Sequence, residues 1–546
     1  MRAFSFFFLL SAVVTVAASE TVEKHVRLLH IADTHAQLET HPEYMPGEKP
    51  ELQAMGGYAR LKTALDRERA SANGAVFLVD GGDTFQGSGP AAWSKGQVVV
   101  APLNALGLGA FVPGNWEPVY GPARFRDLMS QLAAPVLCYN MHDEQSGERL
   151  FKPAVTLEKN GVRVAFVGIT DWTTTLRQSP DEVRGLDSTR VGGLREFVQG
   201  LKKNADLVVA VTHTGLTVSR HLARIVPAFD VILSGHTHER TLKPIMEGRV
   251  IVVEPGSMGS FYGRLDLTLR DGTISNSAFE LVPVRAADFA EDPAVKKLVD
   301  AALEPHRERM SRVLGRSETP IMRYDVLETN ADDFVADVVR ETCGADIGFT
   351  NGFRFSPPIA AGEVHEGDLW NLLPLDSRLK VGWVTGKELR EYLEGELELV
   401  FSTNPLVLSG GWGPRPSGLT FTFAARAPAG QRVRSIQVGG RAAVDDQHYT
   451  FAGCERAGEP LDVVCRHRGT HDVKVLPFTI HEAMPRYFAK HPVITPKRDQ
   501  RTVAVDLPER VLSQDTIVSA QPAPAAEVAK NDPFLKPPNT TTPKPQ

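Results

Sequence analysis

Cysteine is scarce in this chain of 546 residues, and none of its four cysteines has the paired spacing of a zinc knuckle. In an oxidising compartment Cys454 and Cys465 could close a short loop, which would stabilise the fold by roughly 3 kcal/mol. Free buried thiols are an equally good interpretation of all four residues.

Long hydrophobic runs are also missing, and no segment after the N-terminus is apolar over enough residues to span a membrane. The N-terminal run from Phe4 to Val16 is too short for that role. It follows Arg2 and ends at the small residues Val16-Ala17-Ala18, which predicts a cleaved signal peptide over residues 1–18. Because no twin-arginine pair is present, we expect export by the general route and a periplasmic location. A retained anchor helix is the alternative.

A strong excess of one charge is missing as well. The formal net charge of −6 is small for this length and gives no reason to expect a nucleic acid partner. We find no internal repeat. A chain this long needs more than one hydrophobic core, so two or more domains are expected.

The first half contains apolar strand-like runs that alternate with helical patterns, which predicts an α/β layered domain. Residues 58–69 place apolar side chains at helical spacing with charges opposite. Residues 264–269, followed by Asp271-Gly272, predict a hairpin. The expected strands are Val26–Ala32, Ala75–Val79, Val162–Ile169, Leu207–Val211, Val231–Ser234 and Val250–Val253.

Composition divides the rest of the chain. Residues 19–286 form the first expected domain, and residues 287–317 are charged and helix-forming, as a linker would be. A second domain is expected over residues 318–512, where strand signals are weaker and Gly and Pro are more frequent. Residues 513–546 are rich in Pro, Ala and Thr, which predicts a disordered tail.

Five short motifs in the first half supply metal ligands. Four of the ligands, Asp33, Asp83, His213 and His236, lie just beyond the carboxyl end of a predicted strand, where ligands of open α/β sheets gather. Oxygen and imidazole ligands suit Mn, Fe or Zn. The motifs are Asp33-Thr34-His35, Gly81-Gly82-Asp83, Gly114-Asn115-Trp116-Glu117, Thr212-His213-Thr214 and Gly235-His236-Thr237-His238.

Each motif alone has an ordinary structural interpretation, since Gly-Gly-Asp is most often a turn and a lone His is usually structural. Their conjunction and order predict two divalent metal ions that share the carboxylate of Asp83.

With these motifs the chain resembles the calcineurin-like metallophosphoesterase superfamily, and more closely the 5′-nucleotidase family of exported hydrolases, from Val26 to Leu512. The resemblance implies an α/β fold with a four-layer α/β/β/α dimetal domain and a 5′-nucleotidase-type α/β C-terminal domain that binds substrate. It also implies a monomer. By the same resemblance one metal takes Asp33, His35, Asp83 and His238, and the other takes Asp83, Asn115, His213 and His236.

The chain departs from that family at two places. The third motif of nucleotidases has a His, with an Asp three residues later, where this chain has Trp116 and Val119. The stretch from Ala452 to Cys465 stands where nucleotidases carry a Gly-Gly-Asp-Gly loop and an aromatic base clamp. The segment Asn351–Arg354 matches the family's anion-binding motif in shortened form, and the segments 373–375 and 413–418 fall at its substrate cleft.

The Trp variant of the third motif, together with Thr170-Asp171-Trp172-Thr173, resembles the SoxB family of dimanganese thiosulfohydrolases of periplasmic sulfur oxidation. This resemblance implies two divalent metal ions, with manganese expected. It implies hydrolysis of cysteine S-sulfonate (thiosulfonate) carried on a SoxYZ-like sulfur-carrier protein. No membrane partner is expected.

The missing histidine agrees with that chemistry. Phosphate monoester hydrolysis expels an alkoxide, which benefits from a proton donor. A thiosulfonate expels a persulfide, and sulfur anions are stable near neutral pH, since a plain thiol has a pKa of about 8.5. We therefore expect metal-bound hydroxide to attack the sulfonate sulfur and release sulfate.

Candidate residue roles follow from these motifs. Asp83 and Asn115 are candidate catalytic residues. Arg354 is a candidate catalytic residue and anion clamp, because a guanidinium pairs well with arrays of oxygens, although a surface ion pair explains it equally well. The candidate substrate contacts are Trp116, Trp172, Arg354 and Arg415. Trp116 could also simply pack against the wall of the site.

Two other functions remain open on the sequence alone. One is a periplasmic 5′-nucleotidase or nucleotide-sugar hydrolase with an unusual third motif. The other is a non-catalytic metal- or partner-binding protein, against which the complete ligand set argues.

Overall fold

The computed structural model describes residues 23–46, 51–350, 356–408, 413–520 and 525–538. The predicted signal peptide lies outside these residues. Within the described ranges, no helix is both long and apolar enough to cross a membrane.

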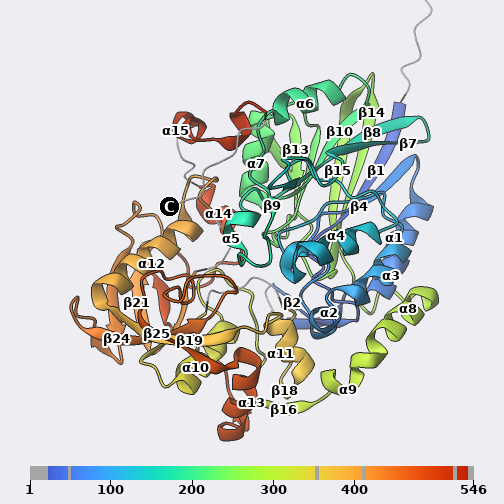
Figure 1. Cartoon of the computed structure of the whole chain (residues 1–546). Coiled ribbons are helices and arrows are strands. Elements are labelled where there is room, and N and C mark those ends of the chain that lie inside the picture. The colour runs from blue at the N-terminus through green and yellow to red at the C-terminus, as the bar shows by residue number, and fades with distance from the viewer. Residues whose placement is uncertain (1–22, 47–50, 351–355, 409–412, 521–524, 539–546) are drawn as a thin grey trace, which may run out of the picture.

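Two sheets pack face to face at the centre of the N-terminal half (Figure 1). Phe77 and Phe166, one from each sheet, meet in this core with ring centroids 5.6 Å apart. The first sheet has the order β15-β14-β1-β4-β5, with β1 Glu23–Ile31, β4 Ala75–Asp80, β5 Ala110–Phe111, β14 Phe261–Arg270 and β15 Thr273–Pro283. The second has the order β12-β13-β11-β10-β8-β7, with β7 Ala154–Lys159, β8 Val162–Thr170, β10 Leu207–His213, β11 Val231–Ser234, β12 Ile245–Glu247 and β13 Val250–Val253.

Helices cover the outer face of each sheet, so the predicted four-layer α/β/β/α arrangement is confirmed (Figure 1). The first sheet is covered by α1 Tyr58–Ser71, α3 Gln97–Ala105, α4 Pro122–Ser130 and α8 Pro293–Leu303. The second is covered by α6 Leu194–Leu201 and α7 Leu216–Ile225.

The predicted strands of this half are all present. β1 and β4 run parallel, as do β8, β10, β11 and β13, so their carboxyl ends lie at a common edge of each sheet. The predicted hairpin joins β14 and β15, and its turn residues Asp271 and Gly272 both have positive φ, 49° and 73°. That conformation suits a tight turn between twisted strands.

The C-terminal half is a second α/β unit. Its main sheet has the order β20-β17-β24-β19-β25, with β17 Ile347–Thr350, β19 Arg378–Thr385, β20 Arg415–Ser417, β24 His448–Cys454 and β25 His471–Thr479. A second sheet has the order β23-β22-β21-β27, with β21 Leu419–Phe423, β22 Val433–Val438, β23 Arg441–Ala442 and β27 Thr502–Ala504. The covering helices include α10 Asn330–Cys343, α12 Gly386–Phe401 and α13 Ile480–Lys490.

The segment predicted as a linker is divided between the two halves. α8 buries Val295, Val299 and Leu303 in the core beneath the first sheet, next to α1 and α3. β16 Val313–Ser317 pairs with β18 Gly362–His365 and β26 Val493–Ile494 of the C-terminal half.

The described part of the C-terminal tail is ordered, whereas its composition predicts disorder. Its described part contains α14 Gln514–Val518, α15 Ala525–Lys530 and a 3-10 turn, Pro533–Leu535. Phe534 is 2% exposed and packs into the core beside the second sheet. Asp532 accepts a hydrogen bond from His221 of α7 at 2.6 Å. Composition misleads here because a few apolar and acidic side chains find partners on the folded N-terminal half.

Candidate dimetal site

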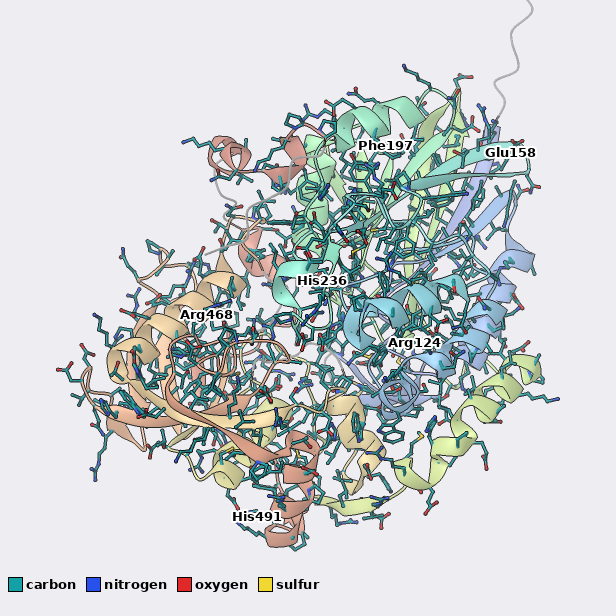
Figure 2. All side chains as sticks on the ribbon, viewed as in Figure 1. Arg124, Glu158, Phe197, His236, Arg468 and His491 are labelled. Atoms are coloured by element: carbon teal, nitrogen blue, oxygen red, sulfur yellow. The ribbon has the colours of Figure 1, made fainter. Side chains whose placement is uncertain are left out.

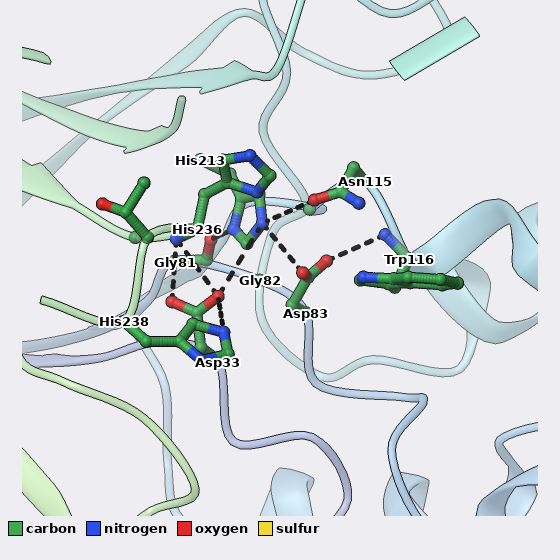
Figure 3. Close-up of polar contacts among 12 residues, drawn as sticks. Asp33, Gly81, Gly82, Asp83, Asn115, Trp116, His213, His236 and His238 are labelled. Carbon is green, nitrogen blue, oxygen red and sulfur yellow. Dashed lines mark hydrogen bonds and ion pairs between the residues drawn. The ribbon is translucent and has the colours of Figure 1, made fainter. Parts of the chain in front are cut away.

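Two groups of ligand side chains, all buried except the half-buried His236, lie side by side at the carboxyl edge of the sheets. Figure 3 labels all of them except His35. Asp33, His35 and His238 form the first group, and Asp83, His213 and His236 form the second. Within each group the ligand atoms lie within 4.8 Å of one another. The structure therefore brings together six of the seven residues predicted to bind metal. The two groups match the sets that the family resemblance implies, except that Asp83, implied for both, is grouped only with the second.

The seventh predicted ligand, Asn115, joins the second group. Its Oδ1 lies 3.2 Å from Nε2 of His213, and that nitrogen lies 3.1 Å from Oδ2 of Asp83. The same Nε2 is 3.9 Å from Oδ1 of Asp33, so the two groups adjoin. Asp83 belongs to the second group, and its charge also acts on Asp33 and His35 of the first, so this carboxylate could serve both cations.

Hydrogen bonds fix which ring nitrogen two of the histidines present. Nδ1 of His35 lies 2.9 Å from the carbonyl oxygen of Gln86, and Nδ1 of His213 lies 2.7 Å from that of Gly81. Since a carbonyl only accepts, Nδ1 carries a proton in both rings, and Nε2 is the nitrogen that faces the site and could bind a metal. Nε2 of His35 and Nε2 of His238 face each other at 3.1 Å. Two ring nitrogens this close together could both bind one divalent cation.

The ligands sit in strained backbone. Positive φ values occur at Asp33 (54°), His35 (46°), Asp83 (54°), His236 (89°) and His238 (55°). This conformation costs a residue with a side chain about 1–3 kcal/mol, so surrounding contacts must hold it, as is common at functional sites.

Glu117, the last residue of the third motif, ties two of the ligand loops together. Its buried carboxylate accepts hydrogen bonds from the backbone N–H groups of Asp83, Thr84, Phe85 and Gly114. Burial raises the pKa of Glu117 to about 7, and the nearby carboxylate of Asp83 adds to the rise. The second and third motifs are thereby locked in one geometry.

Two glycines let these loops approach each other. Gly82 has φ of 90°, and a Cβ there would lie 2.3 Å from the nitrogen of Gly114. A Cβ at Gly114 would lie 2.2 Å from Oδ1 of Asp83. Neither position accepts a side chain without moving a ligand loop.

The charges of the site favour a cation. Burial raises the pKa of Asp33 to about 6, and burial lowers that of His35 to about 4. Burial alone would lower the pKa of His213, but the carboxylates of Asp83 and Asp33 outweigh it and raise the pKa to about 10. The two carboxylates thus hold positive charge at this point, and metal binding would displace the proton.

Glu254 organises the loop that carries the last two histidines. It is fully buried, and its carboxylate accepts hydrogen bonds from Ser234, Thr237 and the backbone N–H of Glu239. Burial raises the pKa of Glu254 to about 7. Glu254 therefore holds the ligand loop in place, and it is not among the described residues that line the adjacent cavity.

A cavity of about 1100 Å³ opens onto the second ligand group. Both halves of the chain contribute to its wall, including His236 from the first and Arg468 from the second, which Figure 2 shows in their respective halves. The apolar part of the wall includes Trp116, Trp172, Leu373, Leu375, Leu399, Leu406, Val407 and Leu408. Among the residues that the structure describes, five arginines also line it: Arg177, Arg378, Arg456, Arg466 and Arg468.

Two predicted substrate contacts lie on this wall. Trp116 donates its backbone N–H to Oδ1 of Asp83 at 2.8 Å, and its indole lies beside that carboxylate (Figure 3). Trp172 lines the same cavity. The predicted clamp, Arg354, lies outside the described residues.

The prediction for Arg415 is wrong. Its side chain is 0% exposed, and Nη2 donates to the backbone carbonyls of Asp325 and Val326 at 3.1 and 3.0 Å. Arg415 is the first residue of β20, and its guanidinium is buried inside the C-terminal half, where Nε lies 3.5 Å from Oδ2 of Asp332. For this reason it does not line the cavity. Cys454 and Cys465, for which a disulfide was one alternative, are free thiols on the cavity wall.

Two family models match the chain in succession. Residues 26–240 match the calcineurin-like phosphoesterase model, and residues 313–454 match the model of the 5′-nucleotidase C-terminal domain. The chain joins a metallophosphoesterase domain to a 5′-nucleotidase C-terminal domain. It is a hydrolase of the 5′-nucleotidase/metallophosphoesterase superfamily.

Curated relatives of this superfamily are distant. The trifunctional nucleotide phosphoesterase YfkN of Bacillus subtilis is 25% identical over 460 residues, which are 75% of this chain but only 30% of YfkN. The 5′-nucleotidase of Vibrio cholerae is 24% identical over 453 residues, covering 72% of this chain and 79% of that protein.

Two solved structures share the fold over most of this chain. The sulfate thiohydrolase SoxB of Thermus thermophilus matches with a TM-score of 0.81 and 23% identity, over 89% of this chain and 98% of that one. A 5′-nucleotidase precursor, also from Thermus thermophilus, matches with a TM-score of 0.76 and 22% identity, over 89% and 100%. At such identities the likeness concerns the fold.

Sequence reasoning did not assign roles to several residues that shape this superfamily site. Glu117 stands inside a recognised motif, so its position was a usable signal. Gln178, whose Nε2 donates to the carbonyl of Asn115 at 2.7 Å, and Arg456, which donates to the carbonyl of Arg177 across the two halves, had no local signal. They become neighbours of the site only after folding.

Proposed function

We propose that the protein hydrolyses cysteine S-sulfonate (thiosulfonate) on a sulfur-carrier protein and releases sulfate, as the SoxB resemblance implies. Two bound divalent metals, with manganese as our proposal, would supply an activated water and neutralise the sulfonate oxygens. In the thiosulfonate form, Cys–S–S–SO₃⁻, oxygen from water bonds to the sulfonate sulfur and the bond between that sulfur and its sulfur neighbour breaks. The cysteine persulfide leaves with the electron pair, and the protons of the water pass to solvent.

The observation that carries the proposal is Trp116 beside Asp83 at the inner end of the cavity. Among the described residues of the cavity wall, the histidines are His236 and His238, both of which belong to the ligand groups. No further imidazole is available there to protonate an alkoxide. A persulfide needs no such donor, because sulfur anions are stable near neutral pH.

The cavity supports a substrate that is borne on a protein. Its volume of about 1100 Å³ exceeds the usual range of roughly 300–1,000 Å³ for small-ligand sites. The described aromatic residues of its wall are Trp116 and Trp172, both from the N-terminal half, so the described C-terminal wall offers no ring to stack on a nucleobase. A carrier segment bearing the modified cysteine would use this room.

Roles can be assigned to the chain's own residues under this proposal. Asp83 accepts the backbone N–H of Trp116 and belongs to the second ligand group, so it would help to fix the position of the reacting water. Asn115 contributes a neutral oxygen, which limits the negative charge of the site. Trp116 and Trp172 would exclude water and orient the sulfonate. We further propose that the enzyme acts in the periplasm as a monomer.

The test is a paired hydrolysis assay on metal-loaded protein, with an S-sulfonated carrier protein as one substrate and a mixture of AMP and UDP-sugars as the other. We expect release of sulfate without phosphate, and loss of that release in Asp33→Ala. Turnover that persists after chelation in metal-free buffer would refute the proposed chemistry. Glu144→Gln, at an exposed carboxylate of the same half and away from the cavity, is the matched control and should keep full sulfate release.

A 5′-nucleotidase is the second candidate, favoured by the names of the curated relatives, such as the Vibrio cholerae enzyme. Release of phosphate without sulfate in the same assay would establish it in place of the first. The position of Trp116 would then be a matter of packing only.

A further inference from the structure

The C-terminal tail returns from the second half of the chain and places α14 between the two halves. α14 contacts α7 on the N-terminal side and α12 on the C-terminal side, as Figure 1 shows. Gln514 of α14 lies next to Glu239 in the metal-ligand loop, although the two residues are 275 positions apart in the chain.

Two backbone groups at the start of α14 hold Glu239, the residue that follows His238. The N–H groups of Gln514 and Asp515 both donate to Oε1 of Glu239, at 2.9 and 3.2 Å. Glu239 is only 8% exposed. On its other side its own backbone N–H donates to Glu254 at 2.9 Å, so the residue is fixed from two directions.

The start of α14 is itself anchored to both halves. Asp515 accepts hydrogen bonds from Thr217 at 2.9 Å and from Arg220 at 2.8 Å, both on α7. The side chain of Gln514 donates to the carbonyl of Val400, near the end of α12, at 2.7 Å. A displacement of either half would therefore be transmitted to Glu239.

We propose that residues 513–519 are a positioning element of the metal site, acting on His238 through Glu239. His238 has φ of 55°, a conformation that costs about 1–3 kcal/mol and persists only where neighbours enforce it. The tail holds the next residue, Glu239, in place. Without it the loop relaxes, and the group formed by Asp33, His35 and His238 binds its cation less tightly.

Two shortened chains separate this role from general packing. A chain that ends at Ala520 keeps α14 but lacks the Asp532 and Phe534 contacts, and it should bind two Mn²⁺ ions with the affinity of the full chain. A chain that ends at Leu512 should bind Mn²⁺ at one of the two sites about 10–100-fold more weakly, the usual effect of losing an outer partner of a ligand. Isothermal titration calorimetry of metal-free protein measures both.

Point variants address the case in which the shortest chain fails to fold. Glu239→Ala removes the acceptor of both backbone bonds and should weaken one Mn²⁺ site as the truncation at Leu512 does. Glu239→Gln keeps an acceptor oxygen and should restore most of the affinity. Full affinity in Glu239→Ala would overturn the proposal. The readout uses no substrate, so it is independent of whether the sulfur chemistry proposed above is right.

Discussion

Replacing Glu117 by Gln should weaken the metal site by an amount that the hydrogen bonds allow us to work out. Oε1 accepts from Thr84 and Phe85, and Oε2 accepts from Asp83 and Gly114. Glutamine keeps one oxygen and presents an NH₂ group where the other stood. Two buried N–H donors then face another donor.

Each buried donor left unsatisfied costs about 1–3 kcal/mol, so the pair costs about 2–6 kcal/mol if the loops do not move. Movement of the loops would reduce that cost, but it would also displace Asp83 and so lower metal affinity. A free energy of 1.4 kcal/mol corresponds to a factor of ten in an equilibrium constant. Even the lower limit of about 2 kcal/mol therefore predicts a loss of more than tenfold, divided between the unfolding equilibrium and the affinity for metal.

Urea unfolding of the metal-free protein measures the loss of stability. Competition for Mn²⁺ with a chelator measures the loss of metal affinity. Glu144→Gln, at an exposed carboxylate on the same half, is the matched control and should change stability by less than about 0.5 kcal/mol. If Glu117→Gln matches that control in both measurements, the assignment of Glu117 as the tie between the two motifs is refuted.

Three further predictions follow from the same structure. Gly82→Ala should abolish tight metal binding, because its Cβ would lie 2.3 Å from the nitrogen of Gly114; retained binding in a calorimetric titration would contradict this. Phe166→Ala, at a fully buried ring between the two sheets, should destabilise the protein by about 3–5 kcal/mol in urea, whereas Phe166→Leu should cost less. Burial raises the pKa of Glu182 on the cavity wall from 4.5 to about 7. Since the unfolded chain ionises this group first, stability should fall as pH rises from about 4.5 to 7 and then level. Glu182→Gln should show a smaller fall than the unmodified protein in a series of thermal melts, since Glu117 and Glu254, whose pKa values are raised in the same way, contribute equally to both. An unchanged slope would contradict the shift.

The metal site could be predicted because its ligands are coded locally. Asp33, Asp83, His213 and His236 all lie at or within three residues of the end of a strand that periodicity alone identifies. Parallel strands then place those ends at one edge of a sheet without further information. The same reasoning holds for the hairpin turn at Asp271-Gly272, whose residues are those that tolerate positive φ.

The other features could not be predicted because they depend on pairs that are distant in the chain. Arg415 follows a Gly-Pro segment that resembles a cleft loop, yet its guanidinium satisfies carbonyls at Asp325 and Val326, 90 and 89 residues away. The tail has the composition of a disordered segment, and its order arises from contacts with α7 that its own sequence does not encode. The cavity wall from Cys454 to Arg468 likewise becomes part of the site only when the two halves meet.

Each ligand group takes members from both sheets. Asp33 and His35 follow β1 of the first sheet, whereas His238 follows β11 of the second, and Asp83 and His213 are divided in the same way. A bound ion is therefore a cross-link between the two central layers. Unfolding either sheet would release both ions, so the folded state gains about 2.7 kcal/mol for each site when free metal is a hundredfold above its dissociation constant. The melting temperature of this protein should thus report the metal concentration around it.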